Sequence, residues 1–163
     1  IAGMVEESGR AVVIAVNKWD LVPPEQKNAA QYREIVTRAL DFISYAPVVF
    51  TVATTGQGVD RLLEAVDKAA ANACRRVLPG ELNALLMEAV LRNPPPPVQG
   101  KRLQIYSGKQ VAETPPVFVL HVNSPELMHF SYRRYLENQL RMAYDFSGTP
   151  IRFKLRRKRR DGA

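Results

Sequence analysis

The sequence has 163 residues, of which 46% are hydrophobic and 24% are charged, and its formal net charge is +7; this is a globular composition with room for one ordinary domain or two small ones. It has no apolar run of about 18 residues or more, and the start IAGMVEESGR has neither the basic nor the apolar region of a signal peptide, so neither membrane insertion nor secretion is expected. The single cysteine, Cys74, cannot form an internal disulfide, and His121 and His129 have no neighbouring thiols, so we expect no metal site and a reducing, cytoplasmic setting.

The first part of the sequence predicts alternating strands and helices. AVVIAV over residues 11–16 is an uninterrupted apolar run, typical of a strand buried on both faces of a parallel sheet, and VVFTVA over residues 48–53 predicts a second buried strand. Apolar residues at helical spacing indicate a helix after each strand, at Tyr32, Ile35, Val36, Ala39, Leu40 and Ile43, and at Val59, Leu62, Leu63, Val66, Ala70 and Ala73. Because such a unit cannot cover both faces of its sheet alone, we expect further strands before Ile1 and a chain that begins within a domain.

The second part, after a boundary near residues 73–79, predicts a small α/β domain. The expected elements are a helix over 82–90, a proline-rich spacer over 94–97, a short strand around 103–105, a strand over 117–122, a long helix starting at Ser124 and Pro125, and a strand over 151–156. The buried side of the long helix is expected from Leu127, Phe130, Tyr135, Leu136, Leu140 and Ala143, with Gly148 just past its end.

The charge is divided unevenly between these two parts. Residues 1–73 carry 7 Lys and Arg against 9 Asp and Glu, a net charge of −2, whereas residues 74–163 carry 16 against 7, a net charge of +9. A basic half of this kind indicates contact with a polyanion, which at this level is RNA, DNA or an acidic membrane surface. The alternative is a charged surface that only maintains solubility.

Asn17-Lys18-Trp19-Asp20 is an NKxD motif directly after the first predicted strand, where ligands gather in α/β sheets. The carboxylate of Asp20 can accept hydrogen bonds from the N1–H and the exocyclic amine of guanine, a pattern that adenine does not offer. Asn17 can bond the base edge and tie neighbouring loops together, while the aliphatic stem of Lys18 can lie over the purine ring. The alternative is a chance match in which Asn17 and Asp20 only form a turn.

A second loop, Ala53-Thr54-Thr55-Gly56-Gln57-Gly58, follows the next predicted strand and opens a helix. Since the ends of consecutive parallel strands lie side by side, this loop is expected beside the NKxD motif. Backbone N–H groups of Ala53 and Thr54 can then bond the guanine carbonyl oxygen. The two loops together indicate a guanine site.

These residues resemble the guanine-specific GTPases, and the resemblance narrows to the EngA (Der) family of bacterial ribosome-assembly GTPases. It rests on NKWDL, TTGQGVDRL, NPPPP, FVLHVNSPELMHFSYRRYLENQLR and GTPIRF, which together cover nearly the whole chain. The resemblance implies an α/β fold in which residues 1–73 are the C-terminal part of a P-loop GTPase domain, with a parallel sheet between two helical layers, and residues 74–163 are a KH-like domain. It also implies GTP or GDP as ligand, Mg²⁺ only in the complete GTPase domain, and ribosomal RNA of the large subunit as partner. We expect a monomer.

The sequence departs from that family pattern at the guanine loop and at the phosphate site. Val52 stands where the family usually has serine, and a GxxxxGK[ST] phosphate loop does not occur in the 163 residues. We therefore assign no catalytic residue and expect GTP hydrolysis by the full-length protein but not by this chain alone. Asp145–Gly148 formally matches the DxxG magnesium motif, but it closes a helix in the wrong domain and is treated as a chance match.

A basic segment at the end of the sequence is the predicted RNA contact. The segment RFKLRRKRR contains seven basic residues: Arg152, Lys154, Arg156, Arg157, Lys158, Arg159 and Arg160. No GxxG loop follows Cys74, so gripping of bases in the usual KH manner is not expected. Tyr106, Tyr132 and Tyr135 could stack on bases, but aromatic residues at helical or strand spacing more often belong to the core, and they are interpreted as core residues. The basic surface could extend to Lys101, Arg102, Lys109, Arg133 and Arg134, although a solvated helix face is favoured for the last two. Two alternatives stay open, a nucleotide-independent RNA-binding module and an anionic membrane contact.

Overall fold

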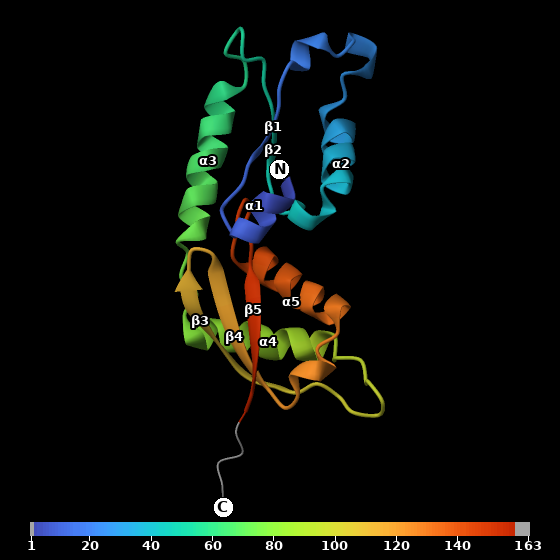
Figure 1. Cartoon of the computed structure of the whole chain (residues 1–163), viewed down its shortest axis with the longest axis vertical. Coiled ribbons are helices and arrows are strands. Elements are labelled where there is room, and N and C mark those ends of the chain that lie inside the picture. Colours follow the sequence, from blue (N-terminus) through green and yellow to red (C-terminus); the bar gives the residue numbers. More distant parts are fainter. Residues whose placement is uncertain (1, 159–163) are drawn as a thin grey trace, which may run out of the picture. The chain divides into compact units, whose positions relative to one another are not determined.

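The computed structural model describes residues 2–158 and divides the chain into two compact units. The first unit contains the chain up to Cys74 together with Phe146–Pro150, and the second contains Arg75–Asp145 and the chain from Ile151 onward. Both units mix helices with strands (Figure 1), so the predicted α/β class is confirmed. None of the helices in the described part of the chain is long and apolar enough to span a bilayer.

The first unit is a parallel strand pair with a helix on each side. Its elements are α1 (Ala2–Ser8), β1 (Ile14–Val16), α2 (Ala29–Ala39), β2 (Val48–Phe50) and α3 (Val59–Ala73). β1 pairs in parallel with β2, with Ile14 opposite Val48, and α2 makes the crossover between them. In Figure 1, α2 and α3 flank the pair, and both helices contact β2. The predicted order of strand, helix, strand and helix is confirmed.

Both strands of this pair are shorter than predicted. β1 begins at Ile14 and its middle residue, Ala15, is exposed, so the expectation of burial on both faces is wrong for these residues. Side chains of a strand point alternately to the two faces of the sheet, and residues 2–158 leave the face of Ala15 uncovered. β2 ends at Phe50 because Val52 leaves the ladder and donates its N–H to the Gln57 carbonyl, at 2.9 Å.

A segment from late in the chain, Phe146–Pro150, completes the first unit. The Thr149 side chain is fully buried, and its hydroxyl donates to the Ala69 carbonyl of α3 at 3.1 Å. Gly148 donates its N–H to the Tyr45 carbonyl at 2.8 Å and accepts from the Val12 N–H at 2.7 Å. This segment was predicted as the end of the long helix, which instead ends at Ala143. The DxxG match therefore lies largely in the first unit, but at the opposite end of β1 from the NKxD motif.

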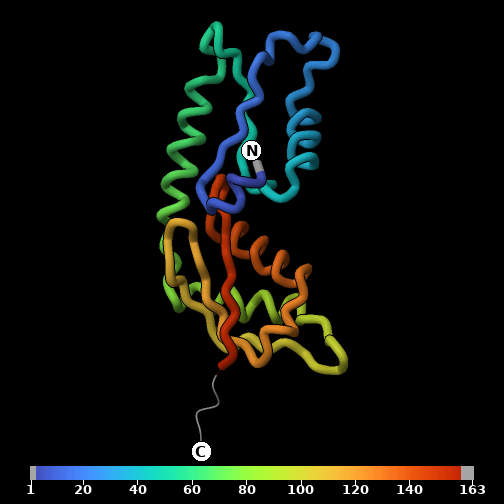
Figure 2. The backbone as a smooth tube through the Cα atoms, in the orientation of Figure 1, coloured from blue at the N-terminus to red at the C-terminus, as the bar shows by residue number. Residues whose placement is uncertain are grey.

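The second unit is a three-stranded sheet packed against two helices. Its elements are α4 (Pro79–Arg92), β3 (Ile105–Glu113), β4 (Pro116–Val122), α5 (Phe130–Ala143) and β5 (Arg152–Arg157). The strand order is β3-β4-β5, with β3 and β4 antiparallel and β4 and β5 parallel (Figure 2). The core contains Leu82, Phe118, Leu120, Leu136 and Leu140, each at most 1% exposed.

Two elements of the second unit differ from the prediction. β3 runs on to Glu113, well beyond the short strand that was predicted. The prediction stopped early because irregularities at Ile105/Ser107 and Gln110/Ala112 interrupt the alternation of side chains along the strand. Ser124 and Pro125 begin a 3-10 turn and not the long helix, since α5 starts only after His129, whose Nδ1 atom accepts the N–H of Ser131 at 3.3 Å. As a result Phe130 is 70% exposed, and Ala143 is exposed as well, so neither lines the core.

Two tyrosines of α5 fasten it to the end of α4. The Tyr132 hydroxyl donates to the Asn93 carbonyl and the Tyr135 hydroxyl to the Ala89 carbonyl, both at 2.9 Å. The Asn93 carbonyl stands at the C-cap of α4, where carbonyls have no partner within the helix, so the Tyr132 bond caps α4. The Ala89 carbonyl also accepts the backbone N–H of Asn93 at 3.0 Å, so Tyr135 adds a second donor there. The predicted core position is thus confirmed for Tyr132, whereas Tyr135 is half-buried. It is wrong for Tyr106, which is 48% exposed.

Candidate functional site

Asn17 ties the two candidate guanine loops together. It follows β1 directly, and its Oδ1 atom accepts the backbone N–H of Ala53 at 3.1 Å and the hydroxyl of Thr51 at 3.3 Å. These partners lie 36 and 34 residues further along the chain, as expected for loops at the carboxyl ends of neighbouring parallel strands. With its oxygen engaged in this way, the carboxamide presents its NH₂ group as a donor.

Trp19 anchors the NKxD motif in the first unit. Its ring is 9% exposed and stands edge-on to Tyr32, with ring centroids 5.1 Å apart, and tilted on Phe50 at 4.3 Å. The backbone N–H of Trp19 donates to the Thr51 carbonyl at 3.1 Å. Lys18, just before it, has a left-handed backbone with φ of 60°, which costs about 1–2 kcal/mol in a residue with a side chain. The burial of Trp19 supports this turn, which leaves Lys18 exposed.

Asp20 and Lys18 are exposed and available to a ligand. Within residues 2–158, neither the carboxylate of Asp20 nor the ammonium group of Lys18 has a hydrogen-bond or ion-pair partner. An ionised carboxylate is an acceptor only, with room for two donors. The geometry of the first loop therefore fits a ligand edge that carries two N–H groups.

In the second loop the two predicted donors have different roles. The N–H of Ala53 is already used in its bond to Asn17. The N–H of Thr54 has no acceptor among the described residues, and Thr54 is exposed. Thr54 therefore provides the free donor for a carbonyl oxygen, whereas Ala53 holds the two loops together. Sequence reasoning could not separate these roles, because they depend on a bond between residues far apart in the chain.

A glycine fixes the end of the second loop. Gly58 has φ of +80°, and a Cβ atom there would stand 2.2 Å from the Phe50 carbonyl oxygen, so only glycine fits. The Thr55 N–H donates to the Val52 carbonyl at 3.2 Å and closes a tight turn. The loop is thus bonded internally although Val52 has no hydroxyl.

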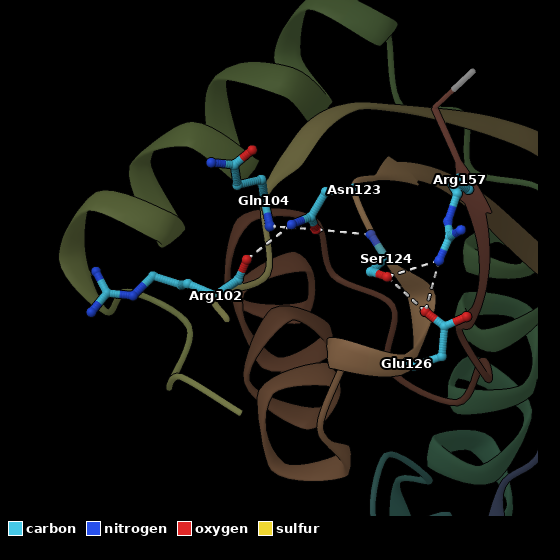
Figure 3. Close-up of polar contacts among 6 residues, drawn as sticks. All are labelled: Arg102, Gln104, Asn123, Ser124, Glu126 and Arg157. Atoms are coloured by element: carbon cyan, nitrogen blue, oxygen red, sulfur yellow. Dashed lines mark hydrogen bonds and ion pairs between the residues drawn. The ribbon is translucent and has the colours of Figure 1, made fainter. Parts of the chain in front are cut away.

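The basic residues of β5 divide between different surroundings. Arg152, Lys154 and Arg156 are exposed and alternate with Phe153, which packs on Phe118 with ring centroids 6.1 Å apart. Arg157 instead donates to the Ser124 hydroxyl at 2.9 Å, and it pairs with Glu126 at 3.4 Å (Figure 3). The Lys158 ammonium lies 5.1 Å from the centroid of the Tyr106 ring, and Arg159 and Arg160 lie outside the described residues.

The turn after β4 holds the partner of Arg157 in place. The Asn123 Oδ1 atom accepts the backbone N–H groups of Gln104 and Ser124, both at 2.9 Å, and its Nδ2 atom donates to the Arg102 carbonyl at 3.0 Å (Figure 3). Hydrogen bonds from its own backbone N–H and from the Ser124 hydroxyl lower the pKa of the Glu126 carboxyl, and Arg157 adds to this effect. These contacts were not predicted from the sequence, because they join segments that are distant in the chain.

Arg133 was expected on a solvated helix face and instead supports β5. Its Nη2 atom donates to the Phe153 carbonyl at 2.6 Å, on the edge of the sheet. It is therefore a structural residue of the second unit and is left out of the candidate RNA contacts.

Comparisons with known proteins agree with this arrangement. A family model described as "KH-domain-like of EngA bacterial GTPase enzymes, C-terminal" matches residues 76–156. Curated proteins named GTPase Der are 53% identical in Moorella thermoacetica, 50% in Pelotomaculum thermopropionicum and 47% in Limosilactobacillus fermentum, over 98–99% of this chain. The chain belongs to the EngA (Der) family. The resemblance drawn from the sequence is thereby confirmed, and the EngA family model covers the helices and strands of the second unit from α4 to β5.

The chain corresponds to a limited share of its EngA relatives. It spans 36–37% of the length of the three GTPase Der proteins named above. Its two units include the guanine-loop candidates and the KH-like domain, whereas the phosphate loop on which a GTPase depends is not among its 163 residues.

Proposed function

We propose that this chain is part of a GTP-binding EngA-family GTPase, and that its first unit recognises the guanine base of GTP or GDP. The observation that carries the proposal is the Asn17–Ala53 hydrogen bond, which brings together two loops that both present unpartnered polar groups. Curated relatives of 47–53% identity are named as GTPases, which supports the same function.

Each residue of the two loops has a role in reading the base. The Asp20 carboxylate accepts the N1–H and the exocyclic amine of guanine, and the Thr54 N–H donates to its carbonyl oxygen. The Asn17 NH₂ group bonds the edge of the base, while the Lys18 stem lies over the ring. Adenine presents the opposite donors and acceptors at this edge, so it would leave Asp20 unsatisfied, at about 1–3 kcal/mol. Ala53 contributes through its bond to Asn17.

In this proposal, binding and hydrolysis of the GTP phosphates depend on residues other than the 163 of this chain. GTP hydrolysis requires a phosphate loop and bound Mg²⁺, and we expect both only in the complete GTPase domain. The 163-residue chain alone is therefore expected to be inactive in hydrolysis.

The proposed role of the protein is assembly of the large ribosomal subunit in the cytoplasm, as a monomer, with the KH-like unit in contact with ribosomal RNA. The support is the net charge of +9 on residues 74–163 and the basic segment at the end of the chain. Its proposed contacts are Arg152, Lys154, Arg156, Arg157, Lys158, Arg159 and Arg160.

Guanine recognition can be tested with Asp20→Asn. The variant would be measured in a chimera in which this chain replaces the matching segment of the Moorella thermoacetica GTPase Der. An amide at position 20 can pair with xanthine but not with guanine, so we expect a roughly 10- to 100-fold loss of GDP affinity, corresponding to about 1.4–2.7 kcal/mol, and a gain for xanthosine diphosphate. The matched control is Asp60→Asn, which removes another exposed carboxylate at the start of α3. It should change neither the affinity for GDP nor the affinity for xanthosine diphosphate. Unchanged guanine preference in Asp20→Asn would overturn the assignment.

A nucleotide-independent RNA-binding module is the second candidate. The second unit has its own core and carries most of the positive charge, and both observations favour this candidate. The test is the RNA affinity of the chimera with GDP and with a non-hydrolysable GTP analogue. Equal affinities would favour this alternative.

A further inference from the structure

Tyr106 is an exposed aromatic residue at an irregular point of β3. The pairs Ile105–Val122 and Ser107–His121 enclose it, so β3 has one residue more than β4 at this point. The extra residue of such a bulge has no partner on the neighbouring strand, and its side chain is re-aimed. Tyr106 is 48% exposed. Its ring therefore contributes little to the core and is accessible to a ligand.

The ring of Tyr106 is held in place at both ends. Its hydroxyl donates to the Oε1 atom of Gln104 at 3.0 Å. The backbone of Gln104 is itself fixed, because its N–H donates to the Asn123 Oδ1 atom at 2.9 Å (Figure 3) and its carbonyl accepts the Asn123 N–H at 3.1 Å. A side chain that is already oriented loses less conformational freedom when a ligand binds.

Two cations lie on the same side of the sheet as the Tyr106 ring. The Lys158 ammonium stands 5.1 Å from the centroid of this ring. Since β4 lies between β3 and β5, the two side chains meet across β4 and therefore share one side of the sheet. Strand alternation places Arg156, two residues before Lys158, on that side as well. Arg156 is exposed, and its guanidinium has no hydrogen-bond or ion-pair partner within residues 2–158.

Arg157, between these two cations, belongs to the other side of the sheet. Its guanidinium donates to the Ser124 hydroxyl and pairs with Glu126 (Figure 3). The row of register partners nearest the ring, Ser107, His121 and Arg156, contains no acidic residue. The side with the ring thus combines an exposed aromatic surface with positive charge.

An aromatic ring beside cations matches the two parts of a nucleotide. Bases stack on aromatic side chains while basic residues follow the phosphates, and the stacking is tolerant of sequence because every base has a π-face. A base within a double helix is covered by its neighbours, so proteins stack on bases of single strands, loops and ends. Lysine carries its charge on a flexible four-carbon stem. The Lys158 ammonium can therefore move from the ring to a phosphate when a base takes its place.

We propose that Tyr106 stacks on an unpaired base of RNA, while Lys158 and Arg156 bind the phosphates next to that base. The backbones of these two cations lie about 6.6 Å apart along the strand, of the order of the spacing between successive phosphates. The inference rests on the proposed RNA contact of the second unit and adds to it a base-binding residue and the form of the RNA. It differs from the usual KH contact, a GxxG loop that clamps the RNA backbone, which does not occur after Cys74.

The test uses the 163-residue chain and two labelled strands with the same number of phosphates. One is an unstructured single-stranded RNA of about 10 nucleotides, and the other is an abasic strand of the same length. The unchanged chain should bind the RNA about 10-fold more tightly than the abasic strand. Tyr106→Leu should weaken RNA binding about 10-fold and change binding of the abasic strand less than about 2-fold. Tyr106→Phe retains the ring, so its RNA affinity should stay within about 3-fold of the unchanged chain.

Salt dependence separates the ring from the cations. Lys158→Ala and Arg156→Ala should each lower the slope of log affinity against log salt by roughly 0.7, one phosphate contact on a single strand, whereas Tyr106→Leu should leave the slope unchanged. Arg157→Ala removes the same charge on the other side of the sheet and should change the slope by less than half as much. Phe130→Leu is the matched aromatic control, because Phe130 is 70% exposed at the start of α5, and it should leave RNA affinity unchanged.

Several results would overturn the inference. Equal binding of the RNA and the abasic strand, or equal losses for both in Tyr106→Leu, would reject stacking. A loss in Phe130→Leu as large as in Tyr106→Leu would show that the position of the ring does not matter, and tighter binding to a duplex of the same sequence would reject the unpaired base. If the unchanged chain binds no RNA, the proposed RNA contact fails together with the inference, whereas RNA binding that is insensitive to Tyr106 rejects the inference alone. Circular dichroism melting checks the folding of each variant.

Discussion

The carboxamide oxygen of Asn17 accepts the backbone N–H of Ala53 at 3.1 Å, and this bond joins the loops that follow β1 and β2. The bond fixes the place of the free N–H of Thr54, since Thr54 is the next residue. Asn17 therefore positions part of the site through the backbone as well as through its own NH₂ group.

Replacing Asn17 with alanine should loosen the second loop. The Ala53 N–H loses an acceptor worth about 1 kcal/mol, so its hydrogen exchange should become about 5-fold faster, as measured by NMR. Asn28→Ala is the control. The Asn28 side chain caps α2 by accepting the N–H groups of Ala30 and Gln31 at 3.1 and 3.2 Å, so those amides should exchange faster while Ala53 is unaffected. No change at Ala53 in Asn17→Ala would contradict the described link.

Two glycines of the second loop should respond differently to alanine. Gly56 and Gly58 both have positive φ, of +78° and +80°, but only at Gly58 would a Cβ atom meet the Phe50 carbonyl oxygen, at 2.2 Å. Gly56→Ala should therefore cost about 1–2 kcal/mol of unfolding free energy from the left-handed backbone, and Gly58→Ala clearly more. Urea unfolding followed by the fluorescence of Trp19 measures both changes. Equal costs would mean that the loop can move away from Phe50.

Thr149→Val should destabilise the first unit although residue 149 lies late in the chain. The substitution keeps the shape of the side chain and removes the buried hydroxyl that donates to the Ala69 carbonyl, at a cost of about 1–2 kcal/mol. The free energy of unfolding measured by Trp19 fluorescence should fall by this amount. Thr54→Val, at an exposed position, should leave that free energy unchanged. A shift seen only in probes of the second unit would contradict the assignment of Phe146–Pro150 to the first.

The stability of the second unit should fall at alkaline pH because of Tyr132. Burial raises the pKa of its hydroxyl from 10.0 to about 12, with a smaller contribution from Tyr135. The folded state therefore favours the neutral form, so this contribution to stability is complete below pH 10 and is lost as the pH rises through 12. Tyr132→Phe should cost about 1 kcal/mol at neutral pH, from the lost bond to Asn93, and should flatten the decline in melting temperature above pH 10. Tyr106→Phe, at a half-exposed ring, should retain the wild-type decline.

The sequence determined those features whose signals lie within a few neighbouring residues. The apolar spacing from Val59 to Ala73 predicts a helix, and α3 has these bounds. The run Val117 to Val122 predicts a buried strand, and β4 covers it. The NKxD motif at the end of a predicted strand indicates the first loop of the candidate site, because strand ends and loop chemistry are both local properties.

Only the tertiary structure decided the features that depend on partners distant in the chain. It separated the role of Ala53 from that of Thr54 through a bond to Asn17, and it assigned Gly148 to a segment packed on α3 where a helix end was predicted. It also gave Arg156 and Arg157 different surroundings, since adjacent residues of a strand point to opposite sides of the sheet and Glu126 lies on only one of them. Local propensity has no information about such partners, because each contact forms only when chain segments more than 30 residues apart are brought together by packing.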